Sequence, residues 1–506
     1  MDNYKLYING KYVNGDSGEF ISVENPADRQ IFARVPDGNQ ADVDRAVAAA
    51  RAAFPKWSAL SPEERADYVG KFADYIERHK DEVGKTITSE IGTPVKYVYG
   101  LQVVSSIEQA RYYSDLARNY SYSEKCGNNI VRKEPIGVIA CLTPWNYPIY
   151  QETSKIFPAI AAGNCIVLKP SQLAPVSAYV LSEAAEEIGL PPGVINIVTG
   201  RGEQVGTLLS KHEDVDMVSF TGSTQQGKKV GMMGIESNVK KIALELGGKS
   251  ASVILRSADY EKAAVGTMME CFLNTGQTCS ALTRLIAPRE IKDDLENFML
   301  AFVKELKVGD PNEPDTRIGP LASEKGFHKV NRYIRLGIEE GAKMICGEIP
   351  DDYENGYYVQ PVIFTDVTND MVIAQEEIFG PILPVLTYEK LEDALSWINQ
   401  RPKPLALYCF TENKKVKKTV LEKCRFGGGC INDTLIHLAT SEMPFGGVGE
   451  SGMGGYHGEA GFAEFTHKRS IVDKKKWMDF PIRYQPYTAK KLKLIRKFLY
   501  SIPYKG

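Results

Sequence analysis

The sequence predicts an α/β fold with two successive lobes, each built on a mainly parallel sheet. Short apolar runs typical of buried strands alternate with helical stretches along most of the chain. Strands separated in this way form βαβ units, in which helices cover both faces of a parallel sheet. A chain of 506 residues is also too long for one compact core. We therefore expect several domains.

The composition is ordinary for a soluble globular protein, with 43% hydrophobic and 25% charged residues. A net charge of −3 favours neither nucleic acid nor an acidic surface as partner. The chain shows no apolar run of membrane-spanning length and no signal peptide at its start, which predicts a cytoplasmic protein. Its nine cysteines form no CxxC pair and its six histidines show no ligand spacing, so we expect neither disulfides nor a bound metal.

The first part of the chain changes from strands to helices. Residues 4–35 alternate short β-like runs with Asn-Gly turn pairs. Residues 42–54 form an alanine-rich amphipathic pattern with acidic residues in the first turn. Ser61, Pro62 and Glu64 then supply an N-cap, a first-turn proline and a capping-box carboxylate. Helices are expected to continue to about Leu116.

Two sets of apolar runs predict the strands of the two lobes. The first set is interrupted by helical stretches, and the second follows Gly248. Open α/β sheets bind ligands at the carboxyl ends of such strands. The predicted strands are 137–142, 165–168, 193–198 and 217–220 in the first lobe, and 252–255, 285–287, 361–364, 383–386 and 406–410 in the second.

Two candidate sites follow strands of the first lobe. After strand 137–142 comes Asn146, whose carboxamide N–H₂ can donate to an oxyanion, although the same residue also suits an Asx-type turn. After strand 165–168 comes Lys169, which can reach ribose hydroxyls or a phosphate, or can simply be solvated.

Two further candidates lie between residues 220 and 249. The loop from Gly222 to Gly227 joins a strand to a helix, so that its backbone N–H groups can hold a pyrophosphate, but a lone Gly-x4-Gly is a weak signal. Glu245 stands in an apolar setting before two glycines, where desolvation would make it a general base. The alternative is a surface glutamate on a strand.

Cys279 lies among small polar residues, in the run Asn274-Thr275-Gly276-Gln277-Thr278-Cys279-Ser280-Ala281. A cysteine kept for packing usually has apolar neighbours. Backbone N–H groups and hydroxyls instead suit a thiolate or an oxyanion. The segment alone leaves a reactive and a structural cysteine equally open.

Taken together, these motifs resemble the NAD(P)-dependent aldehyde dehydrogenase superfamily. The resemblance runs from Tyr7-Ile8-Asn9-Gly10 to Pro444-Phe445-Gly446-Gly447, and includes Val308-Gly309-Asp310-Pro311, Ile318-Gly319-Pro320-Leu321 and Glu376-Glu377-Ile378-Phe379-Gly380-Pro381. It implies that Cys279 attacks an aldehyde to give a thiohemiacetal, with the oxyanion held by Asn146 and the Cys279 N–H. Hydride transfer to the cofactor gives a thioester, which Glu245 hydrolyses by activating water. Coenzyme A acylation, a cysteine hydrolase and an inactive binding protein are the rival functions.

The resemblance also implies a cofactor site for NAD and/or NADP. It places Lys169 on the adenosine ribose, Ser223 on the pyrophosphate and Glu377 on the nicotinamide ribose. Many NAD-selective members have glutamate at the position of Gln172, and its carboxylate repels the 2′-phosphate of NADP. Glutamine removes this repulsion, which predicts that NADP is tolerated. The remaining cofactor residues are Trp145, Ser171, Gly222, Gly227, Leu246, Gly247 and Phe379.

For the substrate, the resemblance implies an aldehyde pocket with aromatic walls. Such walls suit aliphatic or aromatic aldehydes, and less well a cationic aldehyde. No arginine or lysine is evident at the pocket positions, which disfavours dicarboxylic semialdehydes. The expected pocket residues are Tyr147, Tyr150, Thr278, Ser280 and Phe445.

The implied domains are two Rossmann-like lobes and a small oligomerisation extension. Residues 1–116 and 137–247 form the cofactor-binding domain, 248–445 the catalytic domain, and 117–136 with 446–506 the oligomerisation segments and C-terminal tail. Up to about residue 390 the chain resembles the tetrameric branch of the family, and its last quarter resembles the dimeric fatty- and aromatic-aldehyde branch. We expect a homodimer, with a tetramer as the alternative. The basic tail 487–499 is expected to pack on protein, and contact with a membrane surface is the less favoured alternative.

Overall fold

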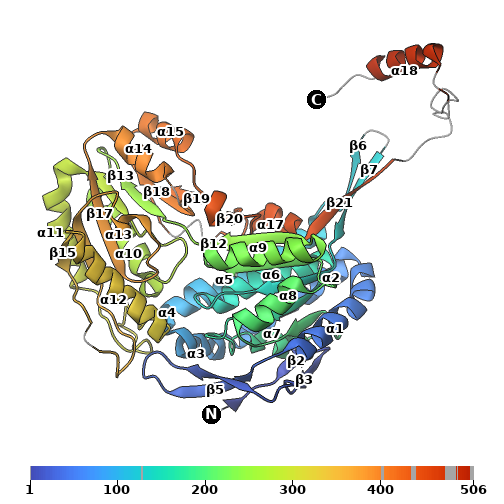
Figure 1. Cartoon of the computed structure of the whole chain (residues 1–506), viewed down its shortest axis with the longest axis horizontal. Helices are drawn as coiled ribbons and strands as arrows, with labels where there is room; N and C mark the ends of the chain where they lie inside the picture. Colours follow the sequence, from blue (N-terminus) through green and yellow to red (C-terminus); the bar gives the residue numbers. More distant parts are fainter. Residues whose placement is uncertain are drawn as a thin grey trace. The chain divides into compact units, whose positions relative to one another are not determined.

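A computed structural model of the chain describes residues 2–126, 129–350, 352–400, 404–434, 440–472, 486 and 488–501. The chain divides into two compact units. Unit 1 comprises residues 1–119 and 135–466, and unit 2 comprises residues 120–134 and 467–506. Unit 1 contains both predicted lobes, and its two large sheets confirm the predicted α/β fold (Figure 1).

The first lobe is organised around an 8-stranded sheet with the order β20-β12-β11-β8-β9-β10-β2-β3. Its central strands from β12 to β10 run parallel, and the antiparallel strands β20, β2 and β3 close its two edges. The strands are β2 (Leu6–Ile8), β3 (Lys11–Val13), β8 (Val138–Leu142), β9 (Cys165–Lys169), β10 (Ile195–Ile197), β11 (Met217–Gly222), β12 (Lys241–Leu246) and β20 (Gly452–Met453).

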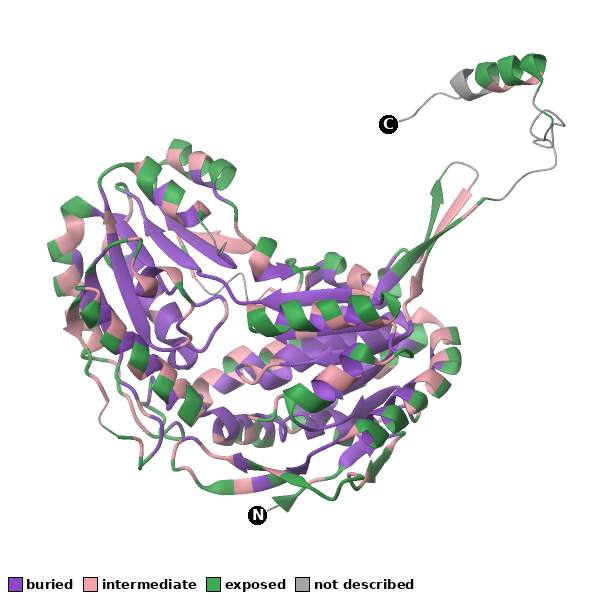
Figure 2. Ribbon diagram, in the orientation of Figure 1, coloured by how far each residue is buried: buried purple, intermediate pink, exposed green. Residues whose placement is uncertain are grey.

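Helix α6 (Pro148–Ala162) is buried along almost its whole length, while the other helices of this lobe expose one face (Figure 2). It packs between β8 and β9 on one side and helices α2 and α5 on the other. The other helices are α1 (Gln40–Ala59), α2 (Pro62–Arg78), α3 (Lys80–Ile91), α4 (Val95–Val98), η1 (Tyr99–Val103), α5 (Val104–Asn119), α7 (Tyr179–Glu187), η2 (Gly202–Gly206), α8 (Thr207–Lys211), α9 (Thr224–Asn238) and α17 (Gly458–Glu464). A 3-stranded sheet of β1 (Asp2–Asn3), β5 (Ile31–Pro36) and β4 (Phe20–Glu24) lies near the N-terminus.

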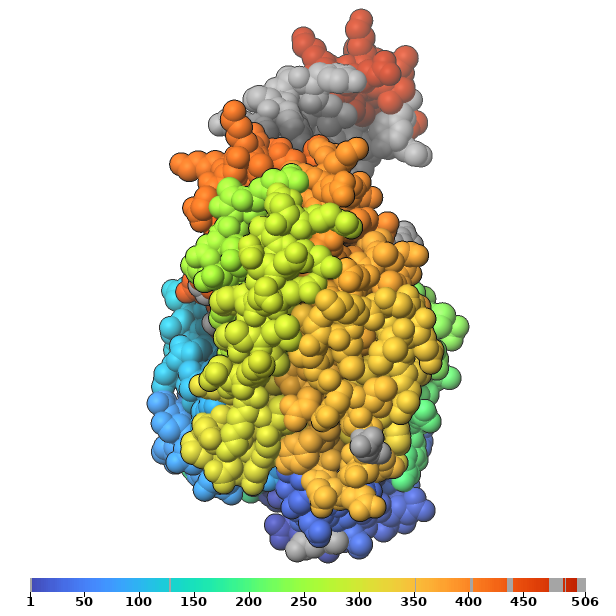
Figure 3. Space-filling model, turned by 90° about the vertical axis from the view of Figure 1, so that its left-hand side faces the viewer, coloured from blue at the N-terminus to red at the C-terminus, as the bar shows by residue number. Residues whose placement is uncertain are grey.

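The second lobe is organised around a 7-stranded sheet with the order β15-β16-β17-β14-β13-β18-β19. Only β15 runs antiparallel to its neighbour. Hydrophobic clusters form on both faces of this sheet, as expected for parallel strands covered by helices. Figure 3 views the molecule from the side of this lobe, whose outer surface is formed by residues coloured from yellow-green to orange.

The strands of this lobe are β13 (Ala251–Ile254), β14 (Leu285–Pro288), β15 (Lys343–Cys346), β16 (Val362–Val367), β17 (Ile382–Tyr388), β18 (Ala406–Phe410) and β19 (Gly428–Ile431). The helices are α10 (Tyr260–Phe272), η3 (Leu273–Gly276), η4 (Arg289–Ile291), α11 (Lys292–Val303), α12 (Glu324–Glu339), α13 (Val372–Gln375), α14 (Leu391–Asn399) and α15 (Lys414–Lys423). Each of the strands predicted in this part of the sequence is present.

Unit 2 contains strands that the sequence analysis did not predict. A 3-stranded sheet has the order β21-β7-β6, with β6 (Ser123–Cys126), β7 (Asn129–Pro135) and β21 (Thr466–Ile471). The C-terminal helix α18 (Ala489–Ser501) covers most of the predicted helical tail. Tyr487 and the Leu499 side chain, which were part of that prediction, lie outside the described part of the chain. Among the described helices, none is long and apolar enough to cross a membrane.

One predicted boundary differs from the structure. Residues 446–466, which we grouped with the oligomerisation segment, belong to unit 1. The physical reason is edge pairing, because β20 adds to the free edge of β12 through Leu244 and Glu245. The strand is too short for its sequence pattern to reveal it.

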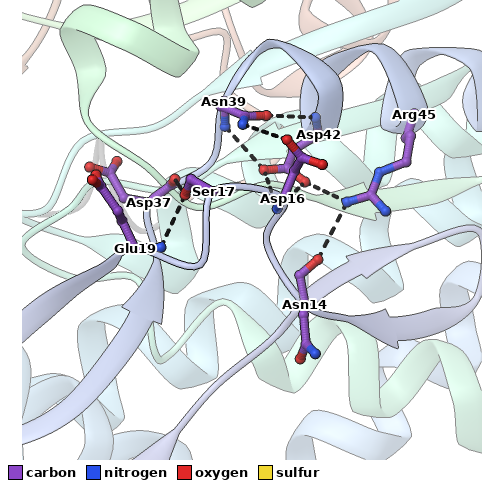
Figure 4. Close-up of polar contacts among 8 residues, drawn as sticks. All are labelled: Asn14, Asp16, Ser17, Glu19, Asp37, Asn39, Asp42 and Arg45. Atoms are coloured by element: carbon purple, nitrogen blue, oxygen red, sulfur yellow. Dashed lines mark hydrogen bonds and ion pairs between the residues drawn. The ribbon is translucent and has the colours of Figure 1, made fainter.

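The start of α1 is fixed by a buried carboxylate rather than by the cap residue alone. Asn39 and Asp42 form a capping box, in which the Asn39 side chain accepts from the Asp42 N–H and the Asp42 carboxylate accepts from the Asn39 N–H at 3.1 Å. The same carboxylate accepts from the Asp16 N–H and pairs with Arg45 (Figure 4). Asp42 therefore joins the start of the helix to the backbone at Asp16, between β3 and β4.

Replacing Asp42 with alanine is expected to lower the free energy of unfolding by about 2 kcal/mol, because the capping box loses its carboxylate and the Asp16 and Asn39 N–H groups lose their buried acceptor. Urea denaturation followed by circular dichroism measures the change. The control is Asp74→Ala in the exposed middle of α2, which should change the value by less than about 0.5 kcal/mol. Equal effects of the two substitutions would contradict this role of Asp42.

Candidate active site

One large cavity of about 1230 Å³ lies at the carboxyl ends of first-lobe strands, and the second lobe lines it with the loop after α10, the start of α12 and the segment before β17. This volume exceeds the usual volume of a pocket for one small ligand, so the cavity has room for a cofactor and a substrate together. Every site residue predicted from the sequence lines this cavity except Gly227. The sequence analysis missed Gln151, Ser154, Tyr456 and His457, which also line it.

A sharply bent loop presents Cys279. Asn274, Thr275 and Gly276 follow α10 with consecutive positive φ angles of 51°, 57° and 74°. Such conformations are costly for residues with a side chain and occur mainly at functional sites. At Gly276 a Cβ atom would lie 2.2 Å from the Gly380 carbonyl oxygen, so that only glycine permits this approach.

Asn146 and Asn274 join the loop to the first lobe through a reciprocal pair of hydrogen bonds. The Asn146 Nδ2 donates to the Gln277 carbonyl oxygen at 2.8 Å, and the Asn274 Nδ2 donates to the Asn146 carbonyl oxygen at 2.9 Å. The Asn146 amide group is buried and fixed beside the cysteine loop, and one of its two N–H bonds is left for a ligand. This is the geometry expected of an oxyanion donor.

Burial favours the uncharged forms of both candidate catalytic groups. The pKa of the Cys279 thiol is raised to about 12 by desolvation and by the negative charges of Glu377 and Glu245. The N–H groups of Ser280 and Cys279 act in the opposite direction. Burial also raises the pKa of Glu245 well above its ordinary value, against the effect of Lys155. The thiol therefore needs a base to remove its proton.

Lys155 is a buried cation below the cavity. Its ammonium group donates to the Thr221 hydroxyl at 2.7 Å and lies 4.0 Å from the centre of the Tyr456 ring. Burial lowers the pKa of Lys155 to about 7. Lys155 was not predicted from the sequence, because the polar residues Gln151–Ser154 that precede it hide the burial of α6.

The predicted pyrophosphate loop opens α9, a helix of 15 residues. Ser223 is its N-cap, so that its hydroxyl and the first N–H groups of the helix lie at the cavity wall. Gly227 lies one turn further along, where a Cβ atom would be 2.3 Å from Leu246. This glycine allows the helix to pack on β12 and does not line the cavity.

Lys169 and Glu377 stand at separate parts of the cavity wall. The Lys169 ammonium group donates to the Pro170 carbonyl oxygen at 2.9 Å, and burial lowers its pKa to about 8. Burial raises the pKa of Glu377 to about 7, and its Oε1 makes no hydrogen bond within the described residues. Gly247 permits the approach of Glu377, because a Cβ atom there would lie 2.1 Å from its Oε2.

These residues fit a nicotinamide dinucleotide. The unsatisfied Glu377 oxygen can accept from a ribose hydroxyl, the α9 N-terminus can hold the pyrophosphate, and Lys169 can donate to the second ribose. Trp145 and Phe379 pack edge to face at 5.6 Å in the same wall. Within the described ranges, no group of three or more histidine, cysteine, aspartate or glutamate residues is placed to hold a metal ion.

Another group of residues forms what we call the aldehyde arm of the cavity. The Tyr147 hydroxyl lies 2.8 Å from the Thr278 hydroxyl, beside Cys279, and the Tyr150 hydroxyl lies 3.1 Å from His457 Nε2. The spacing of three to four residues along α6 brings these side chains to one face of the helix. The arm consists of Tyr147, Tyr150, Gln151, Ser154, Phe445 and His457.

Comparison with known proteins agrees with this geometry. Residues 12–471 match the model of the aldehyde dehydrogenase family. A 3-succinoylsemialdehyde-pyridine dehydrogenase from Pseudomonas sp is 40% identical over 93% of this chain and 98% of the relative. Among solved structures, a mutant of aldehyde dehydrogenase C from Pseudomonas syringae in complex with NAD+ and octanal is 39% identical, with a TM-score of 0.89 over 93% of this chain and 96% of that chain.

The NAD+ complex of an aldehyde dehydrogenase from Bacillus cereus is 34% identical, with a TM-score of 0.89 over 93% of this chain and 96% of that chain. These matches cover both lobes and almost the full length of each relative. The chain therefore belongs to the aldehyde dehydrogenase family and is an NAD(P)-dependent aldehyde dehydrogenase.

Proposed function

We propose that the enzyme oxidises aliphatic or aromatic aldehydes to carboxylic acids through a covalent adduct on Cys279. The observation that carries this proposal is the convergence of Cys279, Asn146 and Glu245 on one cavity, each from a different segment of the chain. A nucleophile, an oxyanion donor and a base are the groups that this reaction requires.

The first step is attack of the Cys279 thiolate on the aldehyde carbon. The C–S bond forms while the electron pair of the carbonyl double bond moves to oxygen. Asn146 and the Cys279 N–H donate to this oxygen, where the negative charge develops. Because the thiol proton is held tightly in the buried site, we assign its removal to Glu245.

The second stage converts the adduct to a carboxylic acid. A nicotinamide cofactor held by Lys169, Ser223 and Glu377 would supply the acceptor for the hydride from the former aldehyde carbon, which would leave a thioester on Cys279. Glu245 then takes a proton from water as the water oxygen bonds to this carbon, the C–S bond breaks and the thiolate is restored. Glu245 favours this hydrolysis over acyl transfer to coenzyme A.

Neutral aldehydes fit the aldehyde arm best. Its tyrosines and Phe445 provide an apolar wall, and none of its members is a lysine or an arginine. The Pseudomonas syringae structure holds octanal, and the Pseudomonas sp relative is named for a pyridine semialdehyde. Both an aliphatic and an aromatic compound are therefore associated with similar enzymes.

We further propose that the enzyme is a cytoplasmic homodimer. The described part of unit 2 is small and holds a sheet of three strands, which supports a cover from a partner subunit. Sedimentation equilibrium should give twice the mass of the chain. Four times that mass would instead support the tetrameric assembly.

Replacing Glu245 with glutamine is expected to separate oxidation from hydrolysis. Single-turnover measurements should show one burst of NADH, slowed because the thiol also loses its base, followed by a steady-state rate at least about a hundredfold below the original, because the base for water is lost. Mass spectrometry should detect an acyl group on Cys279. The Cys279→Ala variant is the control and should show neither the burst nor the adduct.

The pH dependence offers a further check on the same residue. Glu245 acts as a base only when ionised, so the steady-state rate should fall as the pH drops through its raised pKa. The midpoint of this fall should lie above the ordinary range of a carboxyl group. An identical fall in the Glu245→Gln variant would show that another group is responsible.

Gln172, which lines the cavity, is expected to control the choice between NAD and NADP. The original enzyme should prefer NAD+ by less than about a thousandfold in kcat/KM, near 4 kcal/mol. Gln172→Glu should increase this preference at least about tenfold, since a carboxylate repels the 2′-phosphate. Gln204→Glu adds the same charge at an exposed position outside the cavity wall and should leave the preference within about twofold. Steady-state kinetics with both cofactors measures these ratios.

A further inference from the structure

We propose that Gln151 recognises a hydrogen-bond donor on the substrate, so that the enzyme prefers neutral aldehydes carrying a hydroxyl group. The preference is over alkyl analogues of the same size and over aldehydes carrying a carboxylate. This inference rests on the proposed function, because it places the aldehyde carbon at Cys279 and the remainder of the substrate along the aldehyde arm.

Gln151 is a buried amide in the wall of the cavity. It follows Tyr147 by one helical turn on α6, and Ser154 follows it after three residues, so the three side chains share a face. Its side chain is almost fully buried, with a relative exposure of 7%. The Gln151 Oε1 has no hydrogen-bond partner among the described residues. An unpaired buried acceptor is costly unless a ligand or water supplies the donor.

The neighbouring hydroxyl groups are already engaged and cannot supply that donor. The Tyr150 hydroxyl lies 3.1 Å from His457 Nε2. The Ser154 hydroxyl donates to the Tyr150 carbonyl oxygen at 2.7 Å and accepts from Gln109 Nε2 at 2.9 Å. The Thr153 hydroxyl donates to Gln109 Oε1 at 2.7 Å. A donor for Gln151 therefore has to come from the cavity.

The opposite part of the arm is rigid. Phe445 and Tyr456 exchange backbone hydrogen bonds of 2.8 and 2.6 Å, and this bridge holds the adjacent His457 at a φ of 61°. The positive φ is a strained conformation that the surrounding contacts must maintain. The His457 ring packs against Phe445 and Tyr150 with centroid distances of 5.9 and 5.7 Å.

The six residues of the arm include no lysine or arginine, and Lys155 of the same helix does not line the cavity. The Gln109 Nε2 lies 3.3 Å from His457 Nε2, so the two side chains contact each other at the edge of the arm. The lysines that line the cavity belong to other elements, namely β9, α9 and α12. A substrate carboxylate would lose its hydration in this arm without gaining a cationic partner. A hydroxyl group avoids this cost and satisfies Gln151.

The test compares matched aldehydes in the original enzyme and in Gln151→Met, which keeps the side-chain size and removes the acceptor. The probes are 4-(hydroxymethyl)-, 4-ethyl- and 4-carboxybenzaldehyde, with 7-hydroxyheptanal and octanal as an aliphatic pair. We expect the hydroxyl compound of at least one pair to exceed its alkyl partner by about three- to tenfold in kcat/KM, and 4-carboxybenzaldehyde to be the poorest aromatic substrate.

In Gln151→Met the ratio of kcat/KM for the hydroxyl substrate to kcat/KM for its alkyl partner should fall to about one. The kcat/KM for the alkyl compound should be largely retained. The matched control is Gln226→Met, the same change on α9 elsewhere in the cavity wall, which should leave this ratio as in the original enzyme. A ratio near one in the original enzyme for both pairs, or an unchanged ratio in Gln151→Met, would overturn the proposal. If Gln151→Met does not fold, Gln151→Leu takes its place.

Calorimetric binding to the Cys279→Ala protein separates this inference from the proposed function. In Cys279→Ala, the hydroxyl compounds should bind more tightly than their alkyl partners, and this difference should disappear in the double variant with Gln151→Met. That result supports recognition by Gln151 even if the enzyme oxidises no aldehyde with either cofactor and the proposed function fails. Oxidation of all the aldehydes without any preference in binding or rate leaves the proposed function standing and overturns the role of Gln151.

Discussion

The reciprocal hydrogen bonds between Asn146 and the cysteine loop are the contacts on which the site depends. The Asn146 side chain donates to Gln277, and the Asn274 side chain donates back to Asn146. These bonds couple the end of β8 in the first lobe to the loop that follows α10 in the second. Because Asn274 and Thr275 occupy strained left-handed conformations, the loop needs such fixed partners to keep its shape.

Desolvation is the second constraint, and it gives each catalytic group its chemical state. Desolvation raises the pKa values of Cys279, Glu245 and Glu377 and lowers that of Lys155. Each charge that forms in the reaction must therefore be matched by a local donor or acceptor. The same environment strengthens the hydrogen bonds that an oxyanion receives from Asn146.

The parts of the fold that local chemistry determines were predictable from the sequence. The Ser61 capping box and the apolar strand runs depend on neighbouring residues, and both are present. The cavity residues were predictable because Cys279 lies in a distinctive polar run, Asn146 follows a strand, and Glu245 is a carboxylate in an apolar run before two glycines. Their roles as nucleophile, oxyanion donor and base stay predictions.

The features that were missed arise from contacts between distant segments. Gln109 and His457 are 348 residues apart, and only the folded chain places the amide of one beside the ring of the other. Strand β20 likewise exists only because β12 offers an edge.

The division of the cavity supports the proposal that a charged cofactor and a neutral substrate bind in separate parts of it. The side for the dinucleotide is built from strand ends and a helix N-terminus, which supply Lys169, Ser223 and the backbone N–H groups of α9. The aldehyde arm is built from the face of a buried helix, where a charged side chain would be costly. The polar groups that such a wall can hold at low cost are amides and hydroxyls that form hydrogen bonds with one another. An acceptor left over among them, as at Gln151, then becomes the means by which the arm distinguishes one aldehyde from another.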